Sequence, residues 1–390
     1  MTLSWDKIRN KINSLRDLTL IGFANILTTA IGGGFWLVMA HILSTEAYGE
    51  VAYLLSVASI AGTVAVLGAG NTLIVYRAKE VKLQATIYSL ILGSAAITSI
   101  VLYFILYNVS TSVYVIGYVI FTLAISELLG AKLYERYSKY LIAQKVLVVV
   151  FALLLYYLIG QDGIVLGFGL SYFPYFIIVY KGFKETLFDF SFIRDRFKFI
   201  INSYVLDLST ILNGQLDKLI IAPLIGFALL GNYQLGIQVI SLIGILPSIV
   251  YQYVLPRESS GQTNTKLKKG TVLISAILAI LVAFLSPYVI PFLFQKFEEA
   301  VQVVQIMAFT IIPTSINLML ISRFLAREKS RTVLMGSGIF LGVQIPTIFV
   351  LIDLLGVNGV AISHVLANSA ETVYLLYMAK LKIFGKNVQK

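Results

Sequence analysis

The sequence predicts an all-α polytopic membrane protein with about 12 transmembrane helices in two six-helix lobes. Apolar stretches long enough to cross a hydrocarbon layer alternate along the chain with short polar gaps. Of the 390 residues, 58% are hydrophobic and 13% are charged, whereas soluble domains carry about 25% charged residues. Basic residues also concentrate in every second gap, which supports the span count independently of hydropathy.

The distribution of Lys and Arg predicts the orientation. The N-terminus, the gaps after even-numbered spans and the C-terminus hold nearly all of the 30 basic residues, whereas the remaining gaps hold only Lys296. Cytoplasmic loops are enriched in Lys and Arg, so we expect a multi-pass protein of the cell (cytoplasmic) membrane with both termini in the cytoplasm. The net charge of +11 then belongs to the membrane surface, and no nucleic-acid partner is expected.

The expected spans are apolar runs bounded by Gly, Pro or polar residues. In order, they cover residues 18–42, 49–70, 84–107, 112–131, 141–160, 163–181, 199–222, 229–251, 270–294, 301–321, 332–355 and 358–379. The longest inner gap divides them, which predicts an N-terminal lobe at 18–181, a cytoplasmic linker at 182–198 and a C-terminal lobe at 199–379.

Two polar ends flank the lobes. Residues 1–17 are too polar for a secretory signal, and they repeat apolar residues near helical spacing among basic ones. They read either as an amphipathic helix on the inner membrane surface or as a polar tail whose charges set topology. Residues 380–390 form a basic cytoplasmic tail.

A faint internal repeat relates the two lobes. Ala40 ends one aliphatic run and Gly49 follows nine residues later; Ala222 and Gly231 repeat this spacing. Six spans per lobe is an even number, so both lobes enter the membrane from the same side. We therefore expect parallel repeats, related by an axis along the membrane normal, with a cavity between them.

Polar and ionisable side chains inside the spans are the candidate substrate path, because such residues are costly in lipid and usually face a cavity or a partner. These candidates are Asn25, Asp207, Asn213, Asp217, Lys218, Gln234, Gln238, His364, Asn368 and Glu371. Simpler roles stay open for several of them. Asp217 and Lys218 also suit an ion pair near the outer interface, the Gln residues suit helix-to-helix bonding, and His364 with Glu371 suits an internal pair.

The sequence lacks the motifs of the common enzyme classes. It contains no phosphate-binding loop, no HExxH zinc motif, no nucleophile elbow and no Cys. No loop is long enough to hold a separate catalytic domain. The protein is therefore expected to be a transporter, not an enzyme, with no cofactor and no metal.

Three segments resemble the polysaccharide-transporter flippases of the multidrug/oligosaccharidyl-lipid/polysaccharide exporter superfamily. They are GFWLVMAHILSTEAYGEVAYLLSVASIAGTVAVLGAGNTLIVYRAKE, LDKLIIAPLIGFALLGNYQLGIQVISLIGILPSIVYQYVLPRESSG and, near the end, FLAREKSRTVLMGSG with GVNGVAISHVLAN. The resemblance covers nearly the whole chain. One departure is Ala40-His41, where the family usually has Ala-Arg.

The resemblance implies a flippase that moves a polyprenyl phosphate- or pyrophosphate-linked oligosaccharide to the outer leaflet by alternating access, for cell-surface glycan synthesis. Its partners would be that substrate, membrane lipids and glycan-assembly enzymes. Arg77, Arg16 or Arg323 would capture phosphate at the cytoplasmic mouth, and Asp207 or Glu371 would couple transport to an ion gradient.

Two alternatives remain at this stage. A drug/cation antiporter of the same superfamily would share the fold but use an acidic pocket for cationic substrates. A non-transporting membrane subunit would instead act as a scaffold for glycan-assembly enzymes, and its function would depend on charges in the loops.

Overall fold

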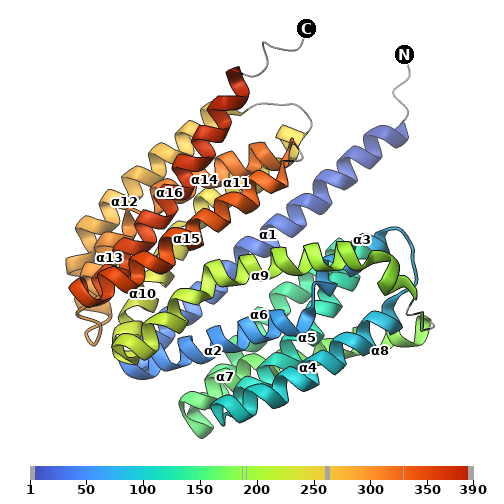
Figure 1. The fold of residues 1–390 in the computed structure, drawn as a ribbon, viewed down its shortest axis with the longest axis horizontal. Helices are drawn as coiled ribbons and strands as arrows, with labels where there is room; N and C mark the ends of the chain where they lie inside the picture. The colour runs from blue at the N-terminus through green and yellow to red at the C-terminus, as the bar shows by residue number, and fades with distance from the viewer. Residues whose placement is uncertain (1–4, 187, 190, 260–263, 328, 385–390) are drawn as a thin grey trace. The chain divides into compact units, whose positions relative to one another are not determined.

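The computed structural model describes the backbone of residues 5–186, 188–189, 191–259, 264–327 and 329–384, and most of their side chains from Thr19 onward. Within these ranges the chain forms 16 α-helices and one 3₁₀ helix and no strand, so the expected all-α architecture is confirmed (Figure 1). In chain order the helices are α1 (Trp5–Ile42), α2 (Thr45–Val66), α3 (Ala69–Ala78), α4 (Gln84–Leu106), α5 (Val109–Gly130), α6 (Tyr134–Ile159), α7 (Gln161–Leu170), η1 (Phe173–Tyr175), α8 (Phe176–Glu185), α9 (Ser191–Ile225), α10 (Phe227–Ile243), α11 (Ile245–Ser259), α12 (Thr265–Leu293), α13 (Ala300–Ala308), α14 (Ile311–Leu325), α15 (Ser330–Leu355) and α16 (Val357–Phe384).

The chain forms two compact units. The first comprises residues 1–32 and 54–211, and the second comprises 33–53 and 212–390. Helices α1, α2 and α9 each contribute residues to both units. The expected linker at 182–198 is mostly helical, because α8 ends at Glu185 and α9 begins at Ser191. The two compact units do not have the bounds of the two six-helix lobes expected from the sequence, and the lobes stay a prediction.

The first unit packs its helices around α5, which contacts α3, α4, α6, α7 and α8. The turn before α5 follows from its sequence. Tyr107 adopts a left-handed backbone conformation after α4, and the Asn108 side chain caps α5 by accepting a hydrogen bond from the Thr111 N–H at 3.0 Å. The same side chain donates to Asp162 of α7 at 3.0 Å, which ties the two turns together.

One element of this unit was not anticipated. Helix α2 ends at Val66, and the chain turns through Leu67 and Gly68, both with positive φ, before α3 begins. A Cβ on Gly68 would also collide with the backbone of Tyr204. Both the positive φ and this close approach therefore favour glycine here. The sequence suggested a continuous span to residue 70 because hydropathy does not register a change of direction.

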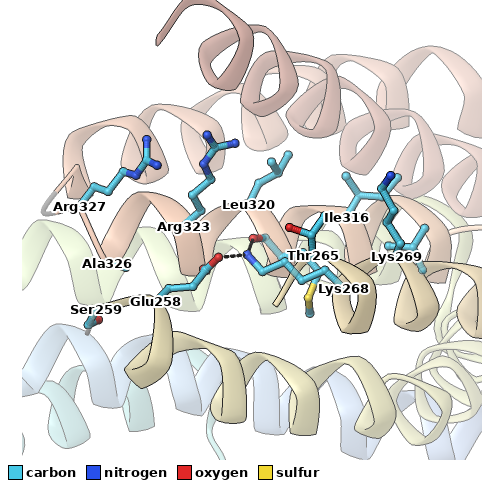
Figure 2. Close-up of a pocket in the computed structure, with 12 residues that line it drawn as sticks. Glu258, Ser259, Thr265, Lys268, Lys269, Ile316, Leu320, Arg323, Ala326 and Arg327 are labelled. Atoms are coloured by element: carbon cyan, nitrogen blue, oxygen red, sulfur yellow. Dashed lines mark hydrogen bonds and ion pairs between the residues drawn. The ribbon is translucent and has the colours of Figure 1, made fainter. Parts of the chain in front are cut away.

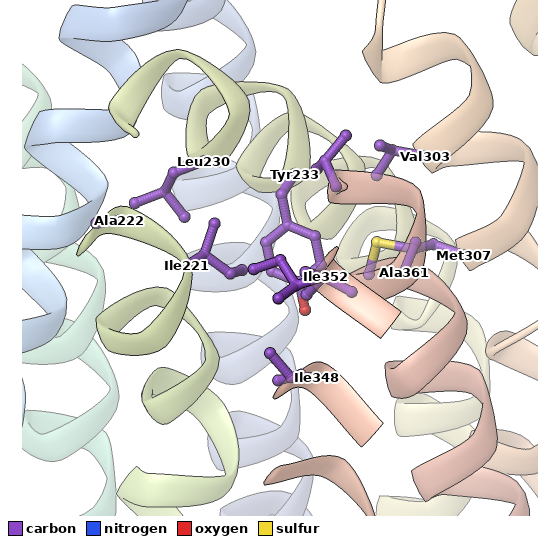
Figure 3. Packing of buried hydrophobic residues seen from close by; sticks show 11 residues of the cluster. Ile221, Ala222, Leu230, Tyr233, Val303, Met307, Ile348, Ile352 and Ala361 are labelled. Carbon is purple, nitrogen blue, oxygen red and sulfur yellow. The ribbon is translucent and has the colours of Figure 1, made fainter. Parts of the chain in front are cut away.

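The second unit is built around a buried apolar cluster (Figure 3). Its members come from α9, α10, α13, α15 and α16, so one cluster joins helices far apart in sequence. Tyr233 of α10 lies at its centre and is fully buried, with its hydroxyl directed out of the apolar side chains toward a polar partner. The fully buried members are Ile221, Leu230, Tyr233, Val303, Met307, Ile348, Val360 and Ala361.

Helices α2 and α10 cross at the two glycines of the internal repeat, Gly49 and Gly231. A Cβ on Gly49 would overlap the carbonyl oxygen of Phe227, and a Cβ on Gly231 would overlap that of Thr45. Each carbonyl lies four residues before the opposite glycine, so the contact is reciprocal. Small residues allow helix backbones to approach this closely. The repeated spacing thus marks matching positions on two helices that touch.

The single basic residue of the outer gaps also has a structural role. Lys296 donates from Nζ to the carbonyl oxygens of Ile42 and Leu43, both at 3.3 Å. These carbonyls end α1 and have no helical partner, and a cation suits the negative end of a helix. His41 Nδ1 lies 3.3 Å from the Leu293 carbonyl oxygen in the same region.

The expected count of 12 spans is not confirmed. In the described residues, nine helical segments are long and apolar enough to cross a membrane, or ten if the bent pair α10–α11 forms one span. The two other expected spans lie in α9 and α16, which are 35 and 28 residues long but carry most of the polar candidates. Polar residues that are paired inside the protein lower the hydropathy of a helix without preventing burial.

The glycine crossing gives a direct test. Gly49→Ala or Gly231→Ala should destabilise the protein by about 1–3 kcal/mol, because the added methyl group pushes two backbones apart. Thermal unfolding of the purified protein in detergent measures this loss. Gly34→Ala is the matched control, since its Cβ meets no atom within 4 Å and alanine favours the helix. Equal melting temperatures for the Gly49, Gly231 and Gly34 variants would contradict the close crossing.

Candidate functional site

The candidate path begins on α9, whose middle is polar. In the first unit, Asn71 of α3 donates to the Asp207 carboxylate at 3.0 Å, and Asp207 remains half-buried. One turn later Thr210 is exposed, and Asn213 and Gly214 follow, the former half-buried and the latter exposed. The helix thus keeps a polar, partly open face at its centre.

The buried ion pair of α9 belongs to the second unit. Asp217 and Lys218 are 2% and 4% exposed, with Lys218 Nζ 3.5 Å from the Asp217 carboxylate and 2.7 Å from the Gly214 carbonyl oxygen. The Tyr233 hydroxyl donates to the other carboxylate oxygen at 2.7 Å. The ion pair of the simpler interpretation therefore forms, and it is buried and satisfied within the unit.

The polar residues of α16 bond to two different helices. Gln344 of α15 lies 3.2 Å from His364 Nδ1, whereas Asn317 of α14 donates to the Glu371 carboxylate at 3.1 Å. Asn317 also donates to the Asn368 carbonyl oxygen at 3.3 Å. His364 and Glu371 thus find separate partners, and Asn317, which the sequence did not single out, links α14 to α16.

The other path candidates occupy varied environments. Gln234 is buried and Gln238 is half-buried on α10, and Asn25 is half-buried on α1. The Asn25 carbonyl oxygen accepts hydrogen bonds from Thr28 and Thr29. The side-chain oxygens of Gln234 and Asn213 are buried and have no hydrogen-bond partner among the described residues.

Arg77 and Arg16 are two of the three arginines proposed for phosphate capture. Arg77 of α3 forms an ion pair with Glu127 of α5 at 2.7 Å, and Tyr88 donates to the same carboxylate at 3.2 Å. Glu127 is 7% exposed, so this arginine balances a buried carboxylate. The side chain of Arg16 lies outside the described residues. Glu127 was detectable from the sequence, as a carboxylate within an expected span.

The third arginine, Arg323, lines a pocket of about 710 Å³ in the second unit (Figure 2). Lys268 and Lys269 of α12, Arg327 after α14, and Glu258 of α11 line it as well. Four cationic groups thus face one carboxylate. The sequence offered a signal for Arg327, because it lies one helical turn after Arg323, but the lysines read only as topology-setting charges.

Lys268 ties together the three helices that form this pocket. Its Nζ lies 2.6 Å from the Glu258 carboxylate on α11, 2.7 Å from the Met319 carbonyl oxygen and 3.0 Å from the Ser322 hydroxyl on α14. Ser322 in turn donates to Glu258 at 2.8 Å. The three ammonium hydrogens therefore all have partners, and the Glu258–Lys268 pair fixes the wall of the pocket (Figure 2).

Comparison with known proteins places the fold. A family model described as "Polysaccharide biosynthesis protein" matches residues 38–271, more than half of the chain, and one described as "Lipid II flippase MurJ" matches residues 230–389. None of the curated proteins matches the chain.

Solved structures match over nearly the whole chain at low sequence identity. A lipid II flippase MurJ in an inward closed conformation has a TM-score of 0.60 at 15% identity, over 96% of this chain and 87% of that one. An inward-facing multidrug resistance MATE transporter of the MOP superfamily reaches 0.68 at 14% identity, over 94% and 96%. A MOP superfamily transporter from Pyrococcus furiosus reaches 0.59 at 13% identity, over 96% of each chain. The chain is a multi-pass membrane protein with this transporter fold.

The anchoring of Lys268 is testable by substitution. Lys268→Met should destabilise the protein by about 3 kcal/mol, because it leaves the Glu258 carboxylate, 11% exposed, without its cation. Adding Glu258→Gln should recover part of this loss, since no unpaired charge then remains. The exposed Lys266→Met is the matched control, and thermal unfolding in detergent is the measurement. Equal stability of the Lys268 and Lys266 variants would show that the contact does not hold the helices together.

Proposed function

Because the chain belongs to the polysaccharide biosynthesis protein family, we propose that it is a flippase for a lipid-linked oligosaccharide. It moves a glycan attached to polyprenyl phosphate or pyrophosphate from the cytoplasmic to the outer leaflet of the cell membrane by alternating access. Both termini lie in the cytoplasm in this proposal, as the distribution of Lys and Arg favours.

The observation that carries the proposal is the polar, partly open face of α9. A helix long enough to cross the membrane presents Asp207, Thr210, Asn213 and Gly214 near its middle, and none of them is fully buried. Polar groups at this depth are expensive in lipid, so the face is suited to water and to sugar hydroxyls. Gly214 leaves open space beside the helix, with no atom within 4 Å of a Cβ built there.

The chemistry of the substrate explains why such a face is needed. A sugar head group cannot cross hydrocarbon without losing the hydrogen bonds that its hydroxyls make with water. Polar side chains along the transport path replace those bonds, while the polyprenyl chain stays in the bilayer. The buried residues Asp217, Lys218 and Gln234, in contrast, lie inside the second unit and are not part of this open face.

Filling the open space at Gly214 should block transport. We expect Gly214→Leu to slow flipping of a polyprenyl-linked fluorescent oligosaccharide in proteoliposomes at least about tenfold, which corresponds to about 1.4 kcal/mol of added barrier. Exposure of the glycan to an outer quencher or glycosidase gives the rate. Gly342→Leu is the matched control, because Gly342 is also an exposed helix glycine with no atom within 4 Å of its Cβ.

The outcomes separate the candidate functions. Flipping that survives Gly214→Leu would remove α9 from the transport path. No flipping of any glycan by folded protein, with uptake of small cationic dyes, would establish the antiporter alternative instead. Neither activity, together with loss of glycan assembly in cells when loop charges are removed, would favour the scaffold.

Two carboxylates are proposed to couple transport to an ion gradient. Asp207 is half-buried beside Asn71, and Glu371 is 9% exposed with Asn317 as its donor, so each combines a negative charge with few partners. Asp207→Asn or Glu371→Gln should abolish the stimulation of flipping by an imposed proton or sodium gradient. Asp353→Asn, at an exposed position on α15, should leave it unchanged. If both of the first two variants respond to the gradient like the original protein, neither carboxylate couples transport.

A further inference from the structure

We propose that the basic pocket between α11, α12 and α14 binds the phosphate group of an amphiphile whose apolar chain lies along the inner wall of the pocket. The ligand chemistry is a phosphate or pyrophosphate ester of a long apolar alcohol or glyceride. This goes beyond flipping itself, because it assigns a binding site within the second unit alone, and only the identification of the amphiphile as substrate rests on the proposed function.

The charges of the pocket favour an anion. Lys268 is already neutralised by Glu258, the one carboxylate among the residues that line the pocket, which leaves the charges of Lys269, Arg323 and Arg327 without a counter-charge on the pocket wall. None of these three side chains has an ion pair or hydrogen bond to another described residue. Figure 2 shows the two arginines extending in the same direction, Arg323 from α14 and Arg327 from the turn after it. Guanidinium groups suit phosphate, because each can donate two hydrogen bonds to its oxygens.

The helices that line the pocket change character along their length. On α14, Ile316 and Leu320 lie on the same face as Arg323, at spacings of three to seven residues. On α12, Val272 lies one turn after Lys268 and Lys269. Both helices therefore present cations at the loop end and half-buried aliphatic side chains deeper in the span. That gradient matches an anionic head group followed by an apolar chain.

The Lys268 contacts give the pocket a fixed shape before any ligand binds. Because Lys268 joins Glu258 of α11 to the Met319 carbonyl and Ser322 of α14, the three helix ends cannot separate without breaking a partly buried ion pair. The arginines are thus presented from a rigid wall, which lowers the ordering cost of binding. On the orientation proposed above, these helix ends face the cytoplasm, where the phosphates of newly made lipid-linked glycans lie.

The test is binding of defined lipids to the whole purified protein in detergent. Native mass spectrometry or displacement of a fluorescent lipid is used to compare polyprenyl phosphate, the same polyprenol without phosphate, phosphatidylglycerol and inorganic pyrophosphate. We expect polyprenyl phosphate to bind at least about tenfold more tightly than polyprenol, because the charged hydrogen bonds are lost with the phosphate. Inorganic pyrophosphate should bind more weakly than polyprenyl phosphate, because it lacks the apolar chain.

Substitutions locate the site. Arg323→Gln with Arg327→Gln should weaken binding of polyprenyl phosphate at least about tenfold, and Arg323→Lys with Arg327→Lys should retain part of it. Lys266→Gln and Arg331→Gln are the matched controls, because they remove equal charge from exposed positions near the same helix ends but do not line the pocket. An unchanged melting temperature for each variant shows that the fold is intact.

Each outcome has one meaning. Equal binding of polyprenol and polyprenyl phosphate, or equal weakening by the pocket and control variants, overturns the proposal. Preference for polyprenyl phosphate over phosphatidylglycerol identifies a substrate site, whereas equal binding of the two supports a site occupied by membrane phospholipid. If binding depends on the arginines but no glycan is flipped, the pocket stands and the proposed function fails; if flipping occurs with arginine-independent binding, the reverse holds.

Discussion

The structure depends on one constraint: inside a bilayer there is no water to satisfy a polar side chain, so its partner must come from another part of the protein. Asp217 finds Tyr233 on the next helix, and Glu371 finds Asn317 on α14. At the loop ends of the helices, just outside the expected spans, Lys268 likewise finds Glu258 on α11 and two oxygens on α14. Each of these bonds joins different helices, so the need to satisfy polar groups also determines which helices pack together.

The same constraint explains the close packing of backbones. Hydrophobic association provides little force between helices in lipid, and stability comes from close van der Waals contact and from such polar bonds. The Gly49–Gly231 crossing supplies the first, and the Tyr233 hydroxyl, two residues from that crossing, supplies the second through Asp217. Helix α10 therefore combines a backbone contact with α2 and a hydrogen bond to α9.

Much of the helical architecture could be predicted from the sequence, because the hydropathy of each segment is a local property. Charge distribution and hydropathy located most helices, and the spacing of Gly49 and Gly231 marked a real contact. The bend at Gly68 and the inward position of Lys218 were not predictable, since both depend on the backbone path and not on composition. Two partners were not predicted for a similar reason. Glu127 is 50 residues from Arg77 and Ser322 is 54 residues from Lys268 along the chain, and only folding brings each pair together.

Whether a cation has a partner within the chain separates structural from ligand-binding roles. Lys218 and Arg77 resemble transport-path residues in the sequence, yet each neutralises a carboxylate that is less than 9% exposed, and removing either would leave that charge unpaired. Arg323 and Arg327 form no ion pair with a described residue, and they line a pocket instead. A bound anion would therefore be attracted by both positive charges without breaking an existing ion pair. By this criterion, substrate recognition is better sought at the loop end of α14 than at the buried pair of α9.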